Sequence, residues 1–151
     1  PNVMRGYWQA DGTAGGGLQG GWFCTGDLGQ QAEDGCITIV GRSKDMVISG
    51  GENIYPAEIE NLLVSLPGVA ECAVVGLPDA RWGEVPVAVL VRSADAAGQG
   101  LTSEAVMQHL DSRIARFKLP RRLVWQDSLP KSALGKVQKP ALLALLTGTN
   151  P

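Results

Sequence analysis

The chain has 151 residues, of which 44% are hydrophobic and 19% are charged, and its 13 Lys and Arg against 15 Asp and Glu give a net charge of −2. This composition predicts one modest core and argues against binding of nucleic acid or membranes by charge alone. No signal sequence opens the chain and no apolar run approaches the ~20 residues that span a bilayer, so we expect a cytoplasmic protein.

The cysteines and the histidine do not indicate a disulfide framework or a zinc site. Cys24, Cys36 and Cys72 lie far apart with no C-x-x-C pair, and His109 is the only histidine. We therefore expect no metal site and ordinary thiols in a reducing compartment.

Glycine dominates the first part of the chain, where residues 1–36 show little periodicity and "AGGGLQGG" is typical of a surface loop. From Ile37 onward, apolar runs alternate with amphipathic stretches, so we expect a domain boundary near residues 40–45. The runs "CITIV" (36–40) and "DMVIS" (45–49) are β-prone, and they predict either a hairpin or two strands joined through a turn.

Two helices and three strands are predicted after a first helix at "YPAEIENLLVSLPG" (55–68), whose apolar residues recur at helical spacing. The strands are "ECAVVGLPD" (71–79), "EVPVAVLVRS" (84–93) and "RRLVWQ" (121–126). In the second helix, Val106, Leu110, Ile114 and Phe117 would lie on one face. The last helix would run from about Pro140 to near Gly148. The order predicts an α+β domain with a β-hairpin and a three-stranded sheet flanked by helices.

A phosphate-binding P-loop is excluded at "LPKSALGKVQKP" (129–140), although the segment contains Gly-Lys. The motif needs glycine where Pro130 stands, and Ser or Thr where Val137 stands. Lys136 could still contact a phosphate or carboxylate as a point charge on a loop, and a solvated turn is the alternative.

Three further places could bind a ligand or could be ordinary turns. Asp27 in "GWFCTGDLG" could accept hydrogen bonds from paired hydroxyls or could close an Asx turn. Arg42 lies in a predicted turn, and Gly50 and Gly51 would let a ligand pass close to the backbone, or form a plain turn.

Two aromatic residues lie beside basic residues, an arrangement that could stack on a base and neutralise phosphates. They are Trp82, next to Arg81, and Phe117, close to Arg121. The alternative is a core-anchoring Phe117 with arginines that face solvent.

Several motifs in order resemble one known family. "VMRGYW", "GWFCTGDLG", "GRSKDMVISGGENIYPAEIE", "GLPDARWGEVPVAVLV" and "PKSALGKVQK" together are similar to the C-terminal third of the adenylate-forming acyl- and aryl-CoA synthetases, over about residues 3–147. The resemblance implies that a carboxylic acid and ATP, with magnesium held mainly by a large N-terminal domain, form an acyl-adenylate and pyrophosphate. Coenzyme A then displaces AMP to make a thioester.

The same resemblance implies roles for individual residues. Asp27 and Arg42 would bind the ATP ribose hydroxyls, and Lys44 would be a hinge about which the C-terminal domain rotates between the two steps. Lys136 would be the adenylation lysine, with Lys131 and Lys139 as supporting charge. The residues implied for coenzyme A are Gly50, Gly51, Glu52, Trp82, Phe117 and Arg121.

By this resemblance, residues 1–43 are a remnant of the large AMP-binding domain that ends at the hinge, and residues 44–148 are the mobile C-terminal domain. The acyl pocket would lie outside the chain, so the acid, a fatty or an aryl acid, is not encoded here. We expect the isolated chain to have no complete ligase activity. An amino-acid-activating or luciferase-like branch of the superfamily, or an interaction module without chemistry, are the alternatives.

Overall fold

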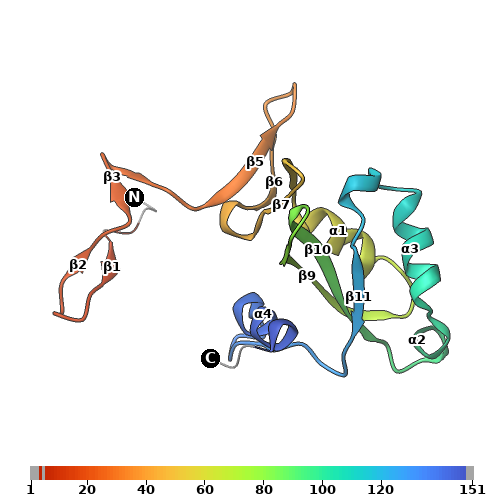
Figure 1. Ribbon diagram of the computed structural model, residues 1–151. Helices are drawn as coiled ribbons and strands as arrows, with labels where there is room; N and C mark the ends of the chain where they lie inside the picture. Colours follow the sequence, from red (N-terminus) through yellow and green to blue (C-terminus); the bar gives the residue numbers. More distant parts are fainter. Residues whose placement is uncertain (1–3, 5, 149–151) are drawn as a thin grey trace.

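The hydrophobic core lies entirely in the second part of the chain. The computed structural model describes residue 4 and residues 6–148, and in this range buried hydrophobic side chains begin at Val47. Four helices and a five-stranded sheet enclose that core, whereas the preceding residues form thin hairpins that extend away from it (Figure 1). The chain therefore has the predicted α+β fold.

Strand β10 (Gly83–Arg92) is the centre of the main sheet. Strand β9 (Val69–Asp79) pairs with it antiparallel along its length, and β11 (Arg122–Trp125) pairs parallel with its second half. At the start of β10, Gly83 pairs with Ser49 of β7 (Val47–Ser49), which forms a hairpin with β8 (Glu52–Ile54).

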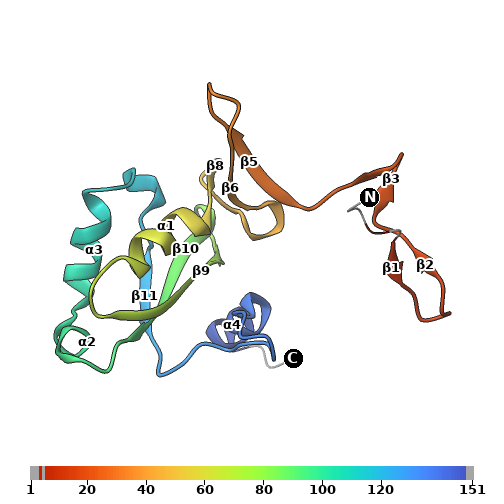
Figure 2. The ribbon, with the colours of Figure 1, turned by 180° about the vertical axis from the view of Figure 1, so that it is seen from behind.

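The two faces of this sheet carry different helices. Helix α1 (Pro56–Val64) and helix α3 (Ser103–Asp111) pack on one face through Ile59, Leu63, Val106 and Leu110. Helix α4 (Lys139–Thr147) packs on the other face through Leu142 (Figure 2). Alternation along β9 explains this arrangement, because Val74 belongs to the first cluster and Ala73 and Val75 to the second.

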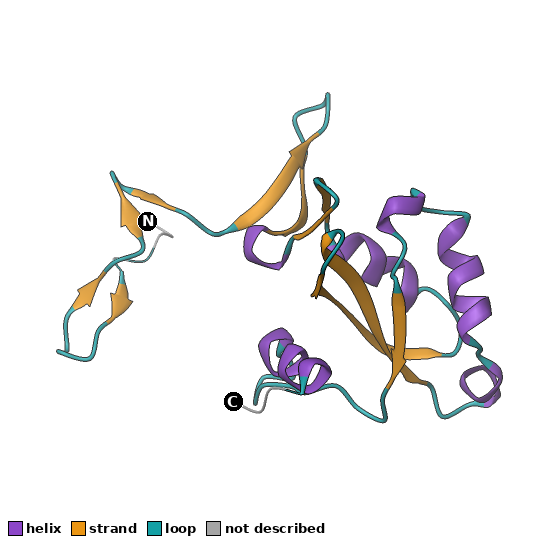
Figure 3. Cartoon of the chain, in the orientation of Figure 1, coloured by secondary structure: helices purple, strands orange, loops and turns teal. Residues whose placement is uncertain are grey.

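Three two-stranded hairpins make up the first part of the described chain (Figure 3). They pair β1 (Tyr7–Trp8) with β2 (Ala14–Gly15), β3 (Leu18–Gln19) with β4 (Trp22–Phe23), and β5 (Asp27–Gln31) with β6 (Ile37–Arg42). Large apolar side chains such as Trp8 and Trp22 are exposed on them.

The structure chooses between the two arrangements predicted for 36–40 and 45–49. These runs are not a hairpin; they are strands β6 and β7, joined by a 3₁₀ turn at Ser43–Asp45, and each pairs with another strand. The predicted helix over Val106 to Phe117 is too long, because α3 ends at Asp111. The short helix α2 (Ala96–Gly100), which Asp95 caps, was not predicted.

Candidate functional site

Asp27 and Arg42 lie directly opposite each other on β5 and β6. The Arg42 Nε donates to Asp27 Oδ1 at 3.1 Å, and both side chains are partly exposed. The backbone N–H of Ser43 donates to the carbonyl of Gly26 at 2.9 Å, which fixes the end of the ladder. The structure thus brings together two residues that were predicted to bind one ligand.

A pocket of about 320 Å³ adjoins this pair. Besides Asp27 and Arg42, it is lined by the start of α1 and by Lys139 at the start of α4. Lys136 lies three residues before Lys139, so the predicted catalytic segment leads directly to the wall of this pocket.

The segment of residues 129–138, which we call the lysine loop, is a tight turn. Ser132 N–H donates to the Lys136 carbonyl and Gly135 N–H to the Ser132 carbonyl, both at 2.8 Å. Gly135 has a φ of +76°, which favours glycine. The Lys136 side chain is exposed and has no ion-pair partner among the residues that the structure describes.

The other two lysines of this region, Lys131 and Lys139, each have a carboxylate partner. Lys131 Nζ lies 2.7 Å from Glu71 Oε1, and Lys139 Nζ lies 2.8 Å from Glu60 Oε1. A carboxylate compensates each of these charges, so Lys136 is the uncompensated ammonium of the three.

Lys44, the predicted hinge residue, lies in the middle of the 3₁₀ turn that joins β6 to β7. Arg42 and Met46, which flank this turn, have extended backbone. A small pocket of about 100 Å³ lies here, with Lys44, Glu84 and Lys139 among its lining residues. The turn at Ser43–Asp45 is the short stretch of chain that links the β5–β6 hairpin, with Asp27 and Arg42, to the main sheet.

Gly50, Trp82 and Arg121 form one cluster at the end of the sheet. Gly50 N–H donates to the Trp82 carbonyl at 2.8 Å, and a Cβ on Gly50 would lie 2.7 Å from the indole Cε3. The Arg121 guanidinium carbon lies 5.5 Å from the Trp82 ring centroid. Asp79 accepts from the Trp82 and Arg81 N–H groups, which lowers the pKa of its carboxyl.

Gly51, Glu52 and Phe117 are less closely joined to this cluster. Gly51 completes the β7–β8 turn and Glu52 begins β8, where it is exposed. Phe117 lies in a 3₁₀ turn at Arg116–Lys118, with 43% of its surface exposed, so it does not anchor the core. Its ring makes no stacking contact with Trp82 among the described residues.

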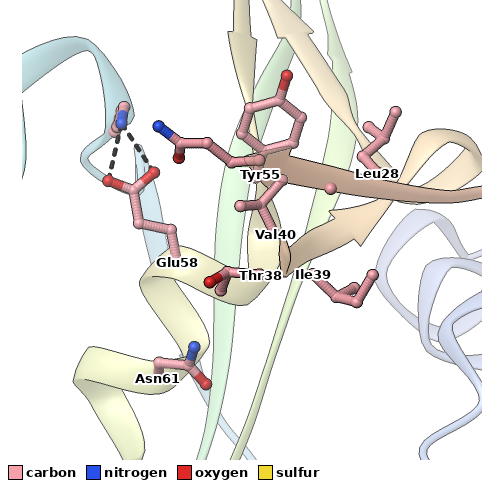
Figure 4. A pocket seen from close by; sticks show the side chains of 10 residues that line it. Leu28, Thr38, Ile39, Val40, Tyr55, Glu58 and Asn61 are labelled. Atoms are coloured by element: carbon pink, nitrogen blue, oxygen red, sulfur yellow. Dashed lines mark hydrogen bonds and ion pairs between the residues drawn. The ribbon is translucent and has the colours of Figure 1, made fainter. Parts of the chain in front are cut away.

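Sequence reasoning missed a cleft of about 680 Å³ between the β5–β6 hairpin and α1. Figure 4 shows Leu28, Thr38, Ile39, Val40, Tyr55, Glu58 and Asn61 around it. Glu58 accepts from Lys118 Nζ through both carboxylate oxygens at 2.7 Å (Figure 4). Its residues come from distant segments without a motif, so no local signal could have indicated it.

Cys72 is the least exposed of the three cysteines. Burial raises the pKa of the Cys72 thiol to about 12, and the neighbouring Glu60 carboxylate adds to the effect. The described residues contain no group of three or more His, Cys, Asp or Glu that could hold a metal ion. No helix in the described part of the chain is long and apolar enough to cross a membrane.

Curated relatives match almost the whole chain. It is 54% identical over 139 residues to an indoleacetate–CoA ligase of Aromatoleum aromaticum, covering 92% of the chain and 27% of that protein. It is 39% identical over 150 residues to a long-chain-fatty-acid–CoA ligase of Mycobacterium tuberculosis, covering 99% and 29%. The chain thus spans less than a third of the length of these relatives.

Solved structures and a family model agree with these relatives. The o-succinylbenzoate CoA synthetase of Bacillus subtilis in complex with an acyl-adenylate intermediate matches with a TM-score of 0.82 at 38% identity, over 93% of this chain and 28% of that one. The same enzyme with ATP and a magnesium ion matches with a TM-score of 0.77 at 38% identity, over 90% and 27%. The model described as the AMP-binding enzyme C-terminal domain matches residues 58–136. This chain belongs to the AMP-binding enzyme C-terminal domain family.

Proposed function

We propose that the chain is the C-terminal part of an AMP-forming acid–CoA ligase. One observation carries the proposal: Lys136 is an exposed ammonium without a carboxylate partner in the described structure, on a segment that leads to the pocket of Asp27 and Arg42. The similarity to proteins named CoA ligases supports it.

In the first step, a carboxylate oxygen of the acid attacks the α-phosphorus of ATP, and pyrophosphate leaves. Negative charge gathers where the two anions approach, and the Lys136 ammonium would stabilise it there. Asp27 would accept hydrogen bonds from the ribose hydroxyls, while Arg42 would orient that carboxylate and contact the ribose. Residues 1–43 would thus hold the nucleotide and residues 44–148 would supply the lysine.

In the second step, the thiol of coenzyme A attacks the acyl carbonyl carbon, and AMP leaves. We propose that residues 44–148 rotate about Lys44 between the steps, since the flanking turn is short and has extended backbone on both sides. The bare backbone at Gly50 and Gly51 would then pass the pantetheine, beside Glu52. Trp82, Phe117 and Arg121 would contact the nucleotide of coenzyme A.

The cosubstrates are ATP and coenzyme A, and the acid is a small molecule of the fatty or aryl class. Magnesium would accompany ATP and neutralise phosphate charge. The chain spans 27–29% of the length of its relatives, and we propose that the magnesium ligands would lie in the large N-terminal domain of the full-length enzyme, which would be the main partner of this chain. A cytoplasmic location without a nucleic-acid partner stays part of the proposal.

The test separates the two half-reactions in the full-length enzyme. Pyrophosphate exchange reports adenylation, and thioester formation from preformed adenylate reports the second step. We expect Lys136→Ala to lower adenylation by on the order of 10²–10³ and to leave the second step nearly unchanged. Arg113→Ala removes another exposed cation, whose guanidinium donates to the His109 carbonyl at the end of α3 and to which no part in either step is assigned, and it serves as the control.

The outcomes distinguish the alternatives. If both steps survive Lys136→Ala, the ligase mechanism fails and an interaction module is favoured. If the wild-type enzyme forms adenylate but no coenzyme A thioester, it belongs to an amino-acid-activating or luciferase-like branch.

A further inference from the structure

We propose that two ion pairs, Lys131–Glu71 and Lys139–Glu60, position the lysine loop, so that Glu60 and Glu71 are positioning residues for adenylation. The inference rests on the proposed role of Lys136. The two pairs lie on either side of that residue, and their carboxylates come from elements far away in the sequence, β9 and α1.

The first pair fixes the beginning of the loop. Lys131 Nζ lies 2.7 Å from Glu71 Oε1, and the two side chains are 40% and 34% exposed. Lys131 also forms a β-bridge with Val137, so its backbone is joined to the other side of the turn. The second oxygen of Glu71 is buried and accepts no hydrogen bond from the described residues, so Lys131 is the group that compensates this carboxylate.

The second pair fixes the end of the loop and is more sheltered, with 22% and 23% of the side chains exposed. Glu60 Oε1 forms an ion pair with Lys139 Nζ at 2.8 Å and accepts a hydrogen bond from the backbone N–H of Val74 at 2.7 Å. One carboxylate oxygen thereby connects α1, β9 and the first residue of α4. Exposed ion pairs contribute little to stability, and more sheltered pairs contribute more. We therefore expect the Lys139–Glu60 pair to hold the loop more strongly than the Lys131–Glu71 pair.

The backbone between the two pairs has little freedom left. Gln138 N–H donates to the Pro130 carbonyl at 2.8 Å, and the Ser132 and Gly135 bonds close the turn. Leu129 is buried at the root of the loop. The exposed Lys136 side chain would be ordered when substrates bind, and a fixed backbone lowers the entropy that this ordering costs.

The two carboxylates also separate the functions of three neighbouring lysines. They compensate the charges of Lys131 and Lys139, so that Lys136 alone is directed to an anionic substrate. Both pairs lie inside residues 44–148, so they would persist when this part rotates about Lys44. The loop would then enter and leave the active site as a preformed unit.

The test uses the full-length enzyme with Glu60→Gln and Glu71→Gln. Glu60→Gln keeps an oxygen that can accept from Val74 N–H and removes only the charge. We expect adenylation to fall about tenfold in Glu60→Gln and by a smaller factor in Glu71→Gln, and thioester formation from preformed adenylate to change less than twofold in both. Glu58→Gln, on the same helix, breaks the Lys118 pair outside the loop and is the matched control.

A second readout does not depend on catalysis. Backbone hydrogen bonds close the turn around Lys136, and opening of the turn should speed tryptic cleavage after this residue. We therefore expect faster cleavage at this bond in Glu60→Gln and Glu71→Gln than in Glu58→Gln. The double variant Glu71→Lys with Lys131→Glu restores an ion pair and should recover both adenylation and protection, unlike either single variant.

Two results would overturn the inference. The first is that Glu60→Gln and Glu71→Gln both show tryptic cleavage and adenylation at wild-type rates. The second is that cleavage becomes faster while adenylation is unchanged, because the position of the lysine loop would then not matter for adenylation. Loss of both half-reactions would indicate general destabilisation and also contradict a positioning role. Lys136→Ala, assayed in parallel, reports separately on the proposed function.

Discussion

At the scale of single residues, identical side chains take different roles according to the carboxylates that the fold places beside them. Lys131 and Lys139 each reach a glutamate within hydrogen-bonding distance, and Lys136 does not. Exposure does not explain the difference, because Lys131 is also exposed. What distinguishes Lys136 is that no carboxylate of the described residues lies within ion-pair distance of its ammonium group.

Gly50 belongs to the residues proposed to bind coenzyme A, and we expect its replacement to be poorly tolerated. It has a φ of +61°, and a Cβ there would lie 2.7 Å from the Trp82 ring, whereas Gly51, with a φ of +88°, faces open space. We expect Gly50→Ala and Gly51→Ala each to lower the free energy of unfolding by about 1–3 kcal/mol through strain. Gly50→Ala should be the worse by about 1 kcal/mol or more, because the indole must also move.

Urea unfolding of the two variants measures this difference directly, with Trp fluorescence as the signal. Equal losses of stability would show that Trp82 shifts freely, and would weaken the view that Gly50 and Trp82 form a fixed surface.

At the scale of elements, α4 connects the lysine loop to the core. Leu142 is 1% exposed and packs in the cluster of Ala73, Val75, Val89 and Leu129, whereas Leu145 is 65% exposed. We expect Leu142→Ala to lower the free energy of unfolding by about 2–5 kcal/mol and Leu145→Ala by less than about 0.5 kcal/mol.

Chemical denaturation of both leucine variants would check this expectation. Similar effects would mean that α4 is not docked through Leu142, and the lysine loop would then lack its base on the sheet.

Helix α3 is shorter than the apolar spacing from Val106 to Phe117 predicts. The apolar spacing from Val106 to Ile114 holds in three dimensions, since Ile114 still packs against the core. Yet the helix stops at Asp111, where Arg113 and Ile114 N–H groups both bond to the Leu110 carbonyl in a closing turn. A turn can keep one more side chain on the same face, so spacing alone does not fix the end of a helix.

At the scale of the whole molecule, the hairpins and the main sheet differ in what supports them. Residues 6–42 bury no hydrophobic side chain, and Trp8 and Trp22 are largely exposed. We predict that a chain of residues 44–148 unfolds in urea at the same midpoint as the whole chain, because its core is complete without the hairpins. A clearly lower midpoint would show that the β5–β6 hairpin stabilises the second part and would contradict the division at residue 43.

Most local elements and the family could be predicted from the sequence alone. Apolar periodicity predicted α1, β9, β10, β11 and α4 near their observed bounds, and the ordered motifs identified the C-terminal domain that the family model confirms. Other features could be known only from the folded chain: the strands with which β6 and β7 pair, the cleft beside Tyr55, and the glutamates that form ion pairs with Lys131 and Lys139. The physical reason is distance along the chain: periodicity reports which face of an element is buried, whereas these contacts join residues that only folding brings together.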